Sequence, residues 1–170
     1  MMMQLHFLLN TRELGIERHN VGAVVYCSEN IPFKEIVSQI PEVSECLNGF
    51  HTPIPKMFYS TYRVKEWDGK TTDGEQCIDL EDETINQDYA DFFGVEVLDG
   101  SMLDEKDGKD KVVINEAAVK VFGWTQPVGK KIAKLGKQYI VKGVIKNISY
   151  NAPIHPGAPA MFHLPDSRDR

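Results

Sequence analysis

The 170-residue sequence has no long apolar run, few cysteines and no catalytic signature. Its longest apolar stretch, Val21–Cys27, has the length of a strand, far short of the ~20 residues that a membrane-spanning helix needs. The first nine residues lack the basic start and the small-residue cleavage site of a signal peptide. As written, the sequence is expected to be a soluble piece. Its 42% hydrophobic residues suffice for one compact domain or two small lobes.

Cysteine is scarce. The three cysteines, Cys27, Cys46 and Cys77, show no C-x-x-C spacing, which excludes a cysteine zinc site and a complete disulfide framework. One disulfide with one free thiol stays open. Cys27 and Cys46 lie in apolar, strand-like runs, which favours buried thiols instead. The cysteines therefore do not decide the redox compartment.

Residue types used in catalysis and metal binding do not form a motif. The five histidines never recur at i+3 or i+4, and no G-x-S-x-G elbow is present. The loop 103–108 resembles a calcium loop, but Leu103 and Ile114 occupy positions where carboxylate ligands are required. The segment 123–131 has five residues, not four, between its glycines, so it is not a phosphate loop. We therefore expect no metal, no cofactor and no enzymatic activity.

A run of carboxylates offers the remaining alternative for catalysis, because paired carboxylates can carry out hydrolysis. The run consists of Asp79, Glu81, Asp82 and Glu83. Three of them alternate on one face of the expected strand, and such a row of like charges is expected to face water. Hydrolysis by this run of carboxylates is therefore the least favoured function.

Positive charge is in deficit overall, since the net charge is −6. This argues against nucleic acid or an anionic bilayer as the main partner. Charge is also segregated: residues 66–110 contain 16 acidic and 3 basic residues, whereas residues 111–165 contain eight lysines and one glutamate. These two regions either attract each other, dock two different partners, or are simply two solvated faces.

Hydrophobic periodicity predicts an α+β protein. A buried strand (21–27), a short helix from Pro32 to Ile40 with an apolar stripe, and a weaker strand (43–50) suit a split βαβ lobe on one sheet face. A strand over 57–67 is expected to form a hairpin with 76–80. We therefore predict a porter-like lobe over roughly residues 1–70.

The second half of the sequence predicts a small α/β lobe over roughly residues 71–165, with antiparallel hairpins. The expected elements are helix 86–93 between Asn86 and Gly94, strand 111–114, helix 116–122 between Asn115 and Gly123, a hairpin of 130–135 with 138–148, and a last strand over 160–164.

Six segments resemble the extracytoplasmic (periplasmic core) domain of MacB/FtsX-like ABC transporter permeases, most closely those of Bacteroidetes-type bacteria. They are Ile40–Val43, Asp88–Val95, Val112–Ala118, Pro127–Ile132, Val141–Asn147 and Pro159–Phe162. Their order matches that of the family, and the resemblance extends from Leu9 to His163. The residues that carry it have scaffold roles: Asn115 caps a helix, Gly129 permits a tight entry to a hairpin, and Gly143 allows a close approach to a strand.

The resemblance implies a non-catalytic domain on the periplasmic side of the cell inner membrane, tethered there by the permease's membrane helices. Such a domain would couple cytoplasmic ATP hydrolysis to export or extraction of a substrate and would dock a partner protein. The implied partners are the rest of the permease, an ATPase domain or subunit, a periplasmic adaptor and a second permease subunit. The family domain usually continues beyond the Pro-rich segment. Residues 1–170 are therefore expected to be one domain fragment, truncated at its C-terminus.

The expected docking residues come from both charged regions. They are Asp104, Glu105 and Asp107 in the acidic region and Lys130 and Lys131 in the basic region.

The alternative function is a ligand-binding module for a peptide, lipid or drug-like molecule, held between the lobes. Its cleft would be lined by the aromatic residues of one strand, although such residues more often belong to the core. These residues are Phe58, Tyr59, Tyr62 and Trp67.

Overall fold

The computed structural model describes residues 33–47, 61–72, 77–148 and 157–164. The elements are α2 (Phe33–Val37), β1 (Thr61–Val64), β2 (Glu66–Trp67), β3 (Lys70–Thr71), β4 (Ile78–Thr84), α3 (Gln87–Phe92), β5 (Val97–Gly100), β6 (Lys111–Asn115), α4 (Glu116–Phe122), β7 (Lys131–Lys134), β8 (Lys137–Ile145) and β9 (Ala160–His163).

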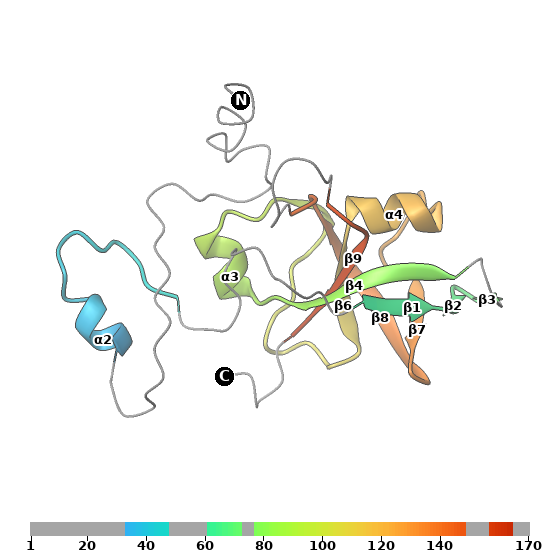
Figure 1. Ribbon diagram of the computed structural model, residues 1–170, viewed down its shortest axis with the longest axis horizontal. Coiled ribbons are helices and arrows are strands. Elements are labelled where there is room, and N and C mark those ends of the chain that lie inside the picture. Colours follow the sequence, from blue (N-terminus) through green and yellow to red (C-terminus); the bar gives the residue numbers. More distant parts are fainter. Residues whose placement is uncertain (1–32, 48–60, 73–76, 149–156, 165–170) are drawn as a thin grey trace, which may run out of the picture.

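The described strands form one mixed sheet (Figure 1). Their order is β1-β4-β9-β6-β8-β7-β2-β3, and β5 pairs with β8 beyond the part of β8 that pairs with β7. The pairs β4–β9 and β6–β8 are parallel, and the others are antiparallel. The α+β class is thus confirmed.

Each face of the sheet has its own apolar cluster, since neighbouring residues of a strand point to opposite faces. One cluster includes α3 and contains Ile85, Tyr89, Ala90, Phe93, Met102, Leu103, Val113, Ile145, Ile148, Ala160 and Phe162. The other includes α4 and contains Val64, Trp67, Ile78, Leu80, Val112, Ile114, Ala118, Phe122, Ile132, Val141, Val144 and Met161. The central strands β6 and β9 contribute to both clusters, so the core runs through the middle of the sheet.

Both predicted capped helices are confirmed. The side chain of Asn86 accepts a hydrogen bond from the backbone N–H of Tyr89 at the start of α3, and Gly94 follows α3 with φ +60°. Asn115 caps α4 in the same way through Ala118, and Gly123 ends α4 in the left-handed conformation. These caps satisfy backbone groups that a helix end would otherwise leave unpaired.

The predicted hairpin of β7 and β8 is also confirmed. Lys134 and Lys137 face each other, and the turn between them consists of Leu135 (φ +50°) and Gly136 (φ +76°). Two positive φ angles in a two-residue turn match the right-handed twist of the flanking strands. Gly129 has φ +85° just before β7, as the prediction of a tight entry requires.

The single strand predicted over 57–67 is wrong in its described part. The chain forms two strands instead, because β1 pairs with β4 whereas β2 pairs with β3 and β7. Strict alternation would place Val64 and Trp67 on opposite faces. The change of partner at Lys65 buries both in the α4 cluster. Residues 57–60 lie outside the described residues.

The expectation that the carboxylates of β4 face water is wrong at Glu83, which is buried with 6% exposure. Asp79 and Glu83 share a strand face by alternation, yet Asp79 is exposed near the sheet's edge strand β1. Glu83 lies opposite Phe162 of the interior strand β9. Position within the sheet, rather than strand face alone, thus decides burial here.

The predicted N-terminal lobe lies largely outside the described residues, including the strand 21–27 and residues 48–50 of the strand predicted over 43–50. Residues 43–47 are described and form no strand, so that prediction is wrong in its described part. Its helix is shorter than predicted, and Ile36 and Ile40 of its apolar stripe are exposed by 51% and 44%. The split βαβ arrangement stays a prediction. So does the division into lobes, although β3 spans its expected boundary and belongs to the same sheet as the later strands.

Candidate functional site

The acidic docking residues lie on the loop between β5 and β6. Buried Met102 and Leu103 anchor the start of this loop. The backbone N–H of Asp104 donates to Oδ2 of Asp107 over 2.7 Å, and Oδ1 of Asp104 accepts from the backbone N–H of Lys106 over 2.9 Å. Side-chain bonds of this kind give the loop a defined shape. They leave Asp104 and Glu105 exposed at its surface.

Asp107 has a different environment from its two neighbours. Its Oδ2 lies 2.5 Å from Nζ of Lys142 on β8, and its side chain is only 17% exposed. Burial acts to raise the pKa of Asp107. Hydrogen bonds from Lys142 and from the backbone of Asp104 act the other way, as do the nearby charges of Lys142 and Lys111. Together they outweigh burial and lower the pKa of Asp107 below its ordinary value. Asp107 therefore holds the loop against the sheet.

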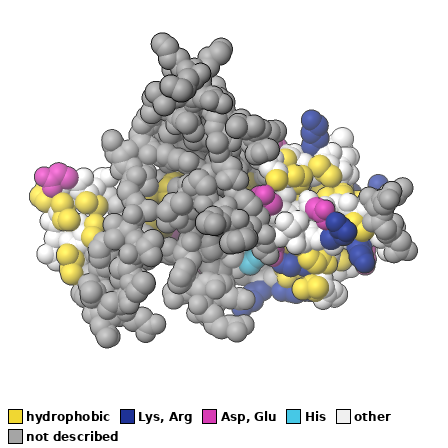
Figure 2. Space-filling view, viewed as in Figure 1, with side chains coloured by type: hydrophobic (Ala, Val, Ile, Leu, Met, Phe, Trp, Pro, Cys, Tyr) yellow, Lys and Arg dark blue, Asp and Glu magenta, His cyan; other side chains and the backbone are white. Residues whose placement is uncertain are grey.

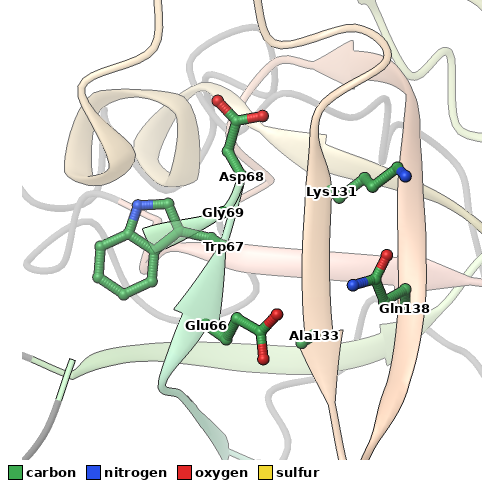
Figure 3. A pocket seen from close by; sticks show the side chains of 7 residues that line it. All are labelled: Glu66, Trp67, Asp68, Gly69, Lys131, Ala133 and Gln138. Carbon is green, nitrogen blue, oxygen red and sulfur yellow. The ribbon is translucent and has the colours of Figure 1, made fainter. Parts of the chain in front are cut away.

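The basic docking residues precede and begin β7. Nζ of Lys130 lies 2.5 Å from Oδ2 of Asp68, which joins the hairpin to the turn after β2. Lys131 is exposed and lines a depression of about 210 Å³ (Figure 3). The lining residues are Glu66, Trp67, Asp68, Gly69, Lys131, Ala133 and Gln138. In Figure 3, Lys131 and Gln138 stand on the hairpin side and Glu66 and Asp68 on the β2 side.

The two charged regions attract each other within the fold. Ion pairs join a carboxylate of the acidic region to a lysine of the basic region at Asp68–Lys130, Asp82–Lys134, Glu96–Lys146 and Asp107–Lys142. Figure 2 shows acidic and basic side chains next to one another at the strand-rich end of the molecule. Of the three interpretations of the charge segregation, internal attraction is therefore the one that the structure supports for these residues.

The structure places the acidic docking residues on the loop between β5 and β6 and the basic ones at the start of β7. Asp107 and Lys130 are engaged in ion pairs of the fold, and Asp104, Glu105 and Lys131 are exposed. A role in docking stays a prediction for all five.

The aromatic residues expected to line a ligand cleft have structural contacts where they are described. The ring of Trp67 packs on Phe122 of α4, with 5.7 Å between the ring centroids, and Trp67 is 8% exposed. The hydroxyl of Tyr62 accepts a hydrogen bond from the backbone N–H of Leu135 over 2.9 Å. Phe58 and Tyr59 lie outside the described residues. These contacts favour a core role over a ligand cleft for Trp67 and Tyr62.

A polar cluster that the sequence did not predict lies where β4, β7 and β9 come together. Asp82 pairs with Lys134, and both side chains are largely buried. Nε2 of His163 lies 3.7 Å from Oδ1 of Asp82. Strand alternation does place Asp82 on the face of buried Leu80. This alternation is the sequence feature that could have predicted the burial of Asp82, but nothing local in the sequence indicates Lys134 as its partner.

Within the parts of the chain that the structure describes, no three His, Cys, Asp or Glu side chains gather in a way that could hold a metal ion. None of the helices in those same parts is long and apolar enough to cross a membrane.

Three solved structures of transporter domains are similar to this chain. A domain of a protein described as a permease from Porphyromonas gingivalis aligns with 65% of this chain at a TM-score of 0.50 and 16% identity. The extracellular domain of the ABC-type transporter YknZ from Gram-positive bacteria aligns with 62% of this chain at a TM-score of 0.44 and 24% identity. The periplasmic region of MacB from Actinobacillus actinomycetemcomitans aligns with 64% of this chain at a TM-score of 0.41 and 20% identity. The chain spans 50% of the length of each.

The chain shares its fold with the Porphyromonas gingivalis permease domain. The predicted resemblance is thereby confirmed at the level of the fold, and the similar structures are domains of transporters, two of them explicitly extracellular or periplasmic. A scan against protein-family models and a search of curated proteins find no match.

Proposed function

We propose that this chain is a non-catalytic extracytoplasmic domain of an ABC transporter permease. In the full protein it couples cytoplasmic ATP hydrolysis to export or extraction of a substrate. The observation that carries this proposal is the fold shared with the permease domain of Porphyromonas gingivalis. The six family-like segments of the sequence, which follow the order of the family, also support it.

Contacts among those segments add to this support. Oδ1 of Asn147 accepts a hydrogen bond from the backbone N–H of Ala117, and Oε1 of Glu116 accepts one from the backbone N–H of Asn147. The segments Val112–Ala118 and Val141–Asn147 thus bind each other reciprocally at the start of α4. This gives the family-like residues a common structural purpose, namely to hold a rigid scaffold that transmits force or presents a surface.

Docking of a partner protein is the second part of the proposal. The exposed residues Asp104 and Glu105 stand on a loop fixed by its own hydrogen bonds, so they present charge without a large ordering cost. Exposed charges of this kind chiefly steer association and select the partner. Lys131 provides the corresponding candidate on the basic side.

The test uses the full-length permease in its native membrane. We expect Asp104→Asn with Glu105→Gln to reduce transport and crosslinking to a periplasmic partner, because the charge that steers docking is removed while residue 104 keeps the Oδ1 that accepts from Lys106. Asp88→Asn with Asp91→Asn makes the same change of charge at exposed positions of α3 and is the matched control. Asp107 and Lys130 are left unchanged, since their replacement would break ion pairs of the fold. Equal transport and crosslinking in both double variants would refute the docking role.

A further inference from the structure

Strand β5 is an edge of the sheet. Among the described residues it pairs with β8 alone, and all four of its residues are exposed. Val97 and Leu98 expose 39% and 47% of their surface. An exposed edge strand presents unpaired backbone N–H and C=O groups, to which a further strand can add. Apolar side chains beside such an edge favour that addition.

The backbone of β5 is held by β8 at both ends of the strand, with a bulge between Val97 and Asp99. The N–H of Gly100 donates to Oδ1 of Asp99 over 2.8 Å. Gly100 lies opposite Gly143, and a Cβ atom on Gly143 would come within 2.3 Å of the carbonyl oxygen of Ser101. The carbonyl of Glu96 accepts from the backbone N–H of Lys146 over 3.0 Å at the other end. The edge is therefore preorganised, which lowers the entropic cost of binding.

The charge around this edge selects the kind of strand that fits it. Asp99 is exposed within β5, and Asp104 and Glu105 are exposed on the loop that follows. Glu96 is partly compensated by Lys146, 3.0 Å away. A second copy of β5 would bring acidic side chains against each other. A segment with lysine or arginine at alternate positions would instead meet opposite charge.

We infer that the outer edge of β5 binds an extended, basic segment of a partner protein by strand addition. Backbone hydrogen bonds to β5 supply affinity, and apolar side chains on one face of the segment cover Leu98. Its basic side chains face Asp99 and the loop at 104–105. The inference deepens the docking role proposed above and rests on that proposal only for the location of the partner.

The experiment titrates the isotope-labelled 170-residue chain with the peptide Lys-Val-Lys-Thr-Lys-Val-Lys and follows amide signals and hydrogen exchange. Amides at 97–100 are expected to shift and to exchange more slowly when the peptide binds. Leu98→Lys is expected to weaken binding about tenfold, through lost apolar burial and added repulsion. Leu135→Lys is the matched control, because Leu135 is 84% exposed at the distant tip of the β7–β8 hairpin.

Three kinds of result would overturn the inference. One is binding without the expected selectivity, either between Leu98→Lys and Leu135→Lys or between the lysine peptide and a peptide with glutamate in its place. Another is protection, before peptide is added, of those amides at 97–100 that do not donate to β8, which would mean that the chain itself covers the outer edge. The third is dimerisation that Leu98→Lys abolishes, which would make a second copy the occupant. Because the titration needs no permease, it can succeed even if the transport experiment fails, and the reverse also holds.

Discussion

The side chain of Asn115 joins three parts of the chain through one buried amide, which is 1% exposed. Its Oδ1 accepts from the backbone N–H groups of Ala118 and Ala160, each over 2.9 Å. Its Nδ2 donates to the carbonyl of Ala158 over 2.7 Å. Both lone pairs and one donor of the amide are thus used. The start of α4 is thereby fixed to the start of β9.

We expect Asn115→Ala to destabilise the protein by about 3 kcal/mol, because it removes a cap and leaves the backbone N–H of buried Ala160 without this partner. Asn86→Ala is the matched control, since Asn86 also caps a helix but has a single such bond in α3. That change should cost about 1 kcal/mol. Urea unfolding measures both. Equal losses would show that Asn115 acts as a cap and nothing more.

The sequence predicts that Asn115 caps a helix, but not that it binds the start of β9. An asparagine before a helical segment indicates a cap, and Asn115 is one. Its bonds to Ala158 and Ala160 span 43 and 45 residues, and no local pattern indicates them. Asp107 shows the same limit: its place on the acidic loop is visible in the sequence, but its partner Lys142 lies 35 residues away.

Among the elements, β5 and β8 approach each other more closely than side chains would allow. A Cβ on Gly143 would meet backbone atoms of Ser101, and a Cβ on Gly100 would come within 2.3 Å of the carbonyl oxygen of Lys142. Backbone atoms cannot move aside as the end of a flexible side chain can. The pairing of β5 with β8 therefore depends on both glycines.

Gly143→Ala is expected to cost about 3 kcal/mol, because β5 must move away from β8. Gly136→Ala in the β7–β8 turn is the control: its φ is +76°, but a Cβ there meets nothing within 4 Å. Backbone strain alone should cost about 1 kcal/mol in that variant. Thermal unfolding gives the two losses, and amide exchange at 97–100 should quicken in Gly143→Ala only. Unchanged exchange there would contradict the close-approach argument.

Elements with local signals could be predicted, and those set by distant pairing could not. The caps of α3 and α4 and the Leu135–Gly136 turn depend on residues next to one another in the sequence. The break between β1 and β2 at Lys65 depends on two different partner strands, β4 and β7, and the run 57–67 shows no turn residue there.

Across the whole molecule, the sheet curls so that strands far apart in its order come together. β1 and β7 are separated by four strands in that order, yet the hydroxyl of Tyr62 on β1 accepts from the backbone N–H of Leu135. Lys134 of β7 pairs with Asp82 of β4. The curl thus brings oppositely charged residues of the two charged regions together. The segregation of charge is visible in the sequence, but its pairing is not, since Asp82 and Lys134 lie 52 residues apart.

The Asp82–Lys134 pair provides a test of this closure, because its side chains are only 13% and 15% exposed. Lys134→Met keeps the length of the side chain but leaves the Asp82 carboxylate buried without its cation. We expect a loss of about 3–5 kcal/mol in the free energy of unfolding. Asp82→Asn combined with Lys134→Met should lose less than Lys134→Met alone, since the uncompensated charge is gone.

The control is Arg63→Met, which breaks the pair between Arg63 and Asp79 on β1 and β4. That pair has good geometry, at 2.9 Å, and its hydrogen bond lowers the pKa of Asp79, but its side chains are 64% and 50% exposed. Solvent screening should make its loss much smaller than that of Lys134→Met. Urea unfolding of the variants separates the contributions. If Lys134→Met cost no more than Arg63→Met, the apolar cluster around α4 alone would suffice to hold β7 against β1 and β4.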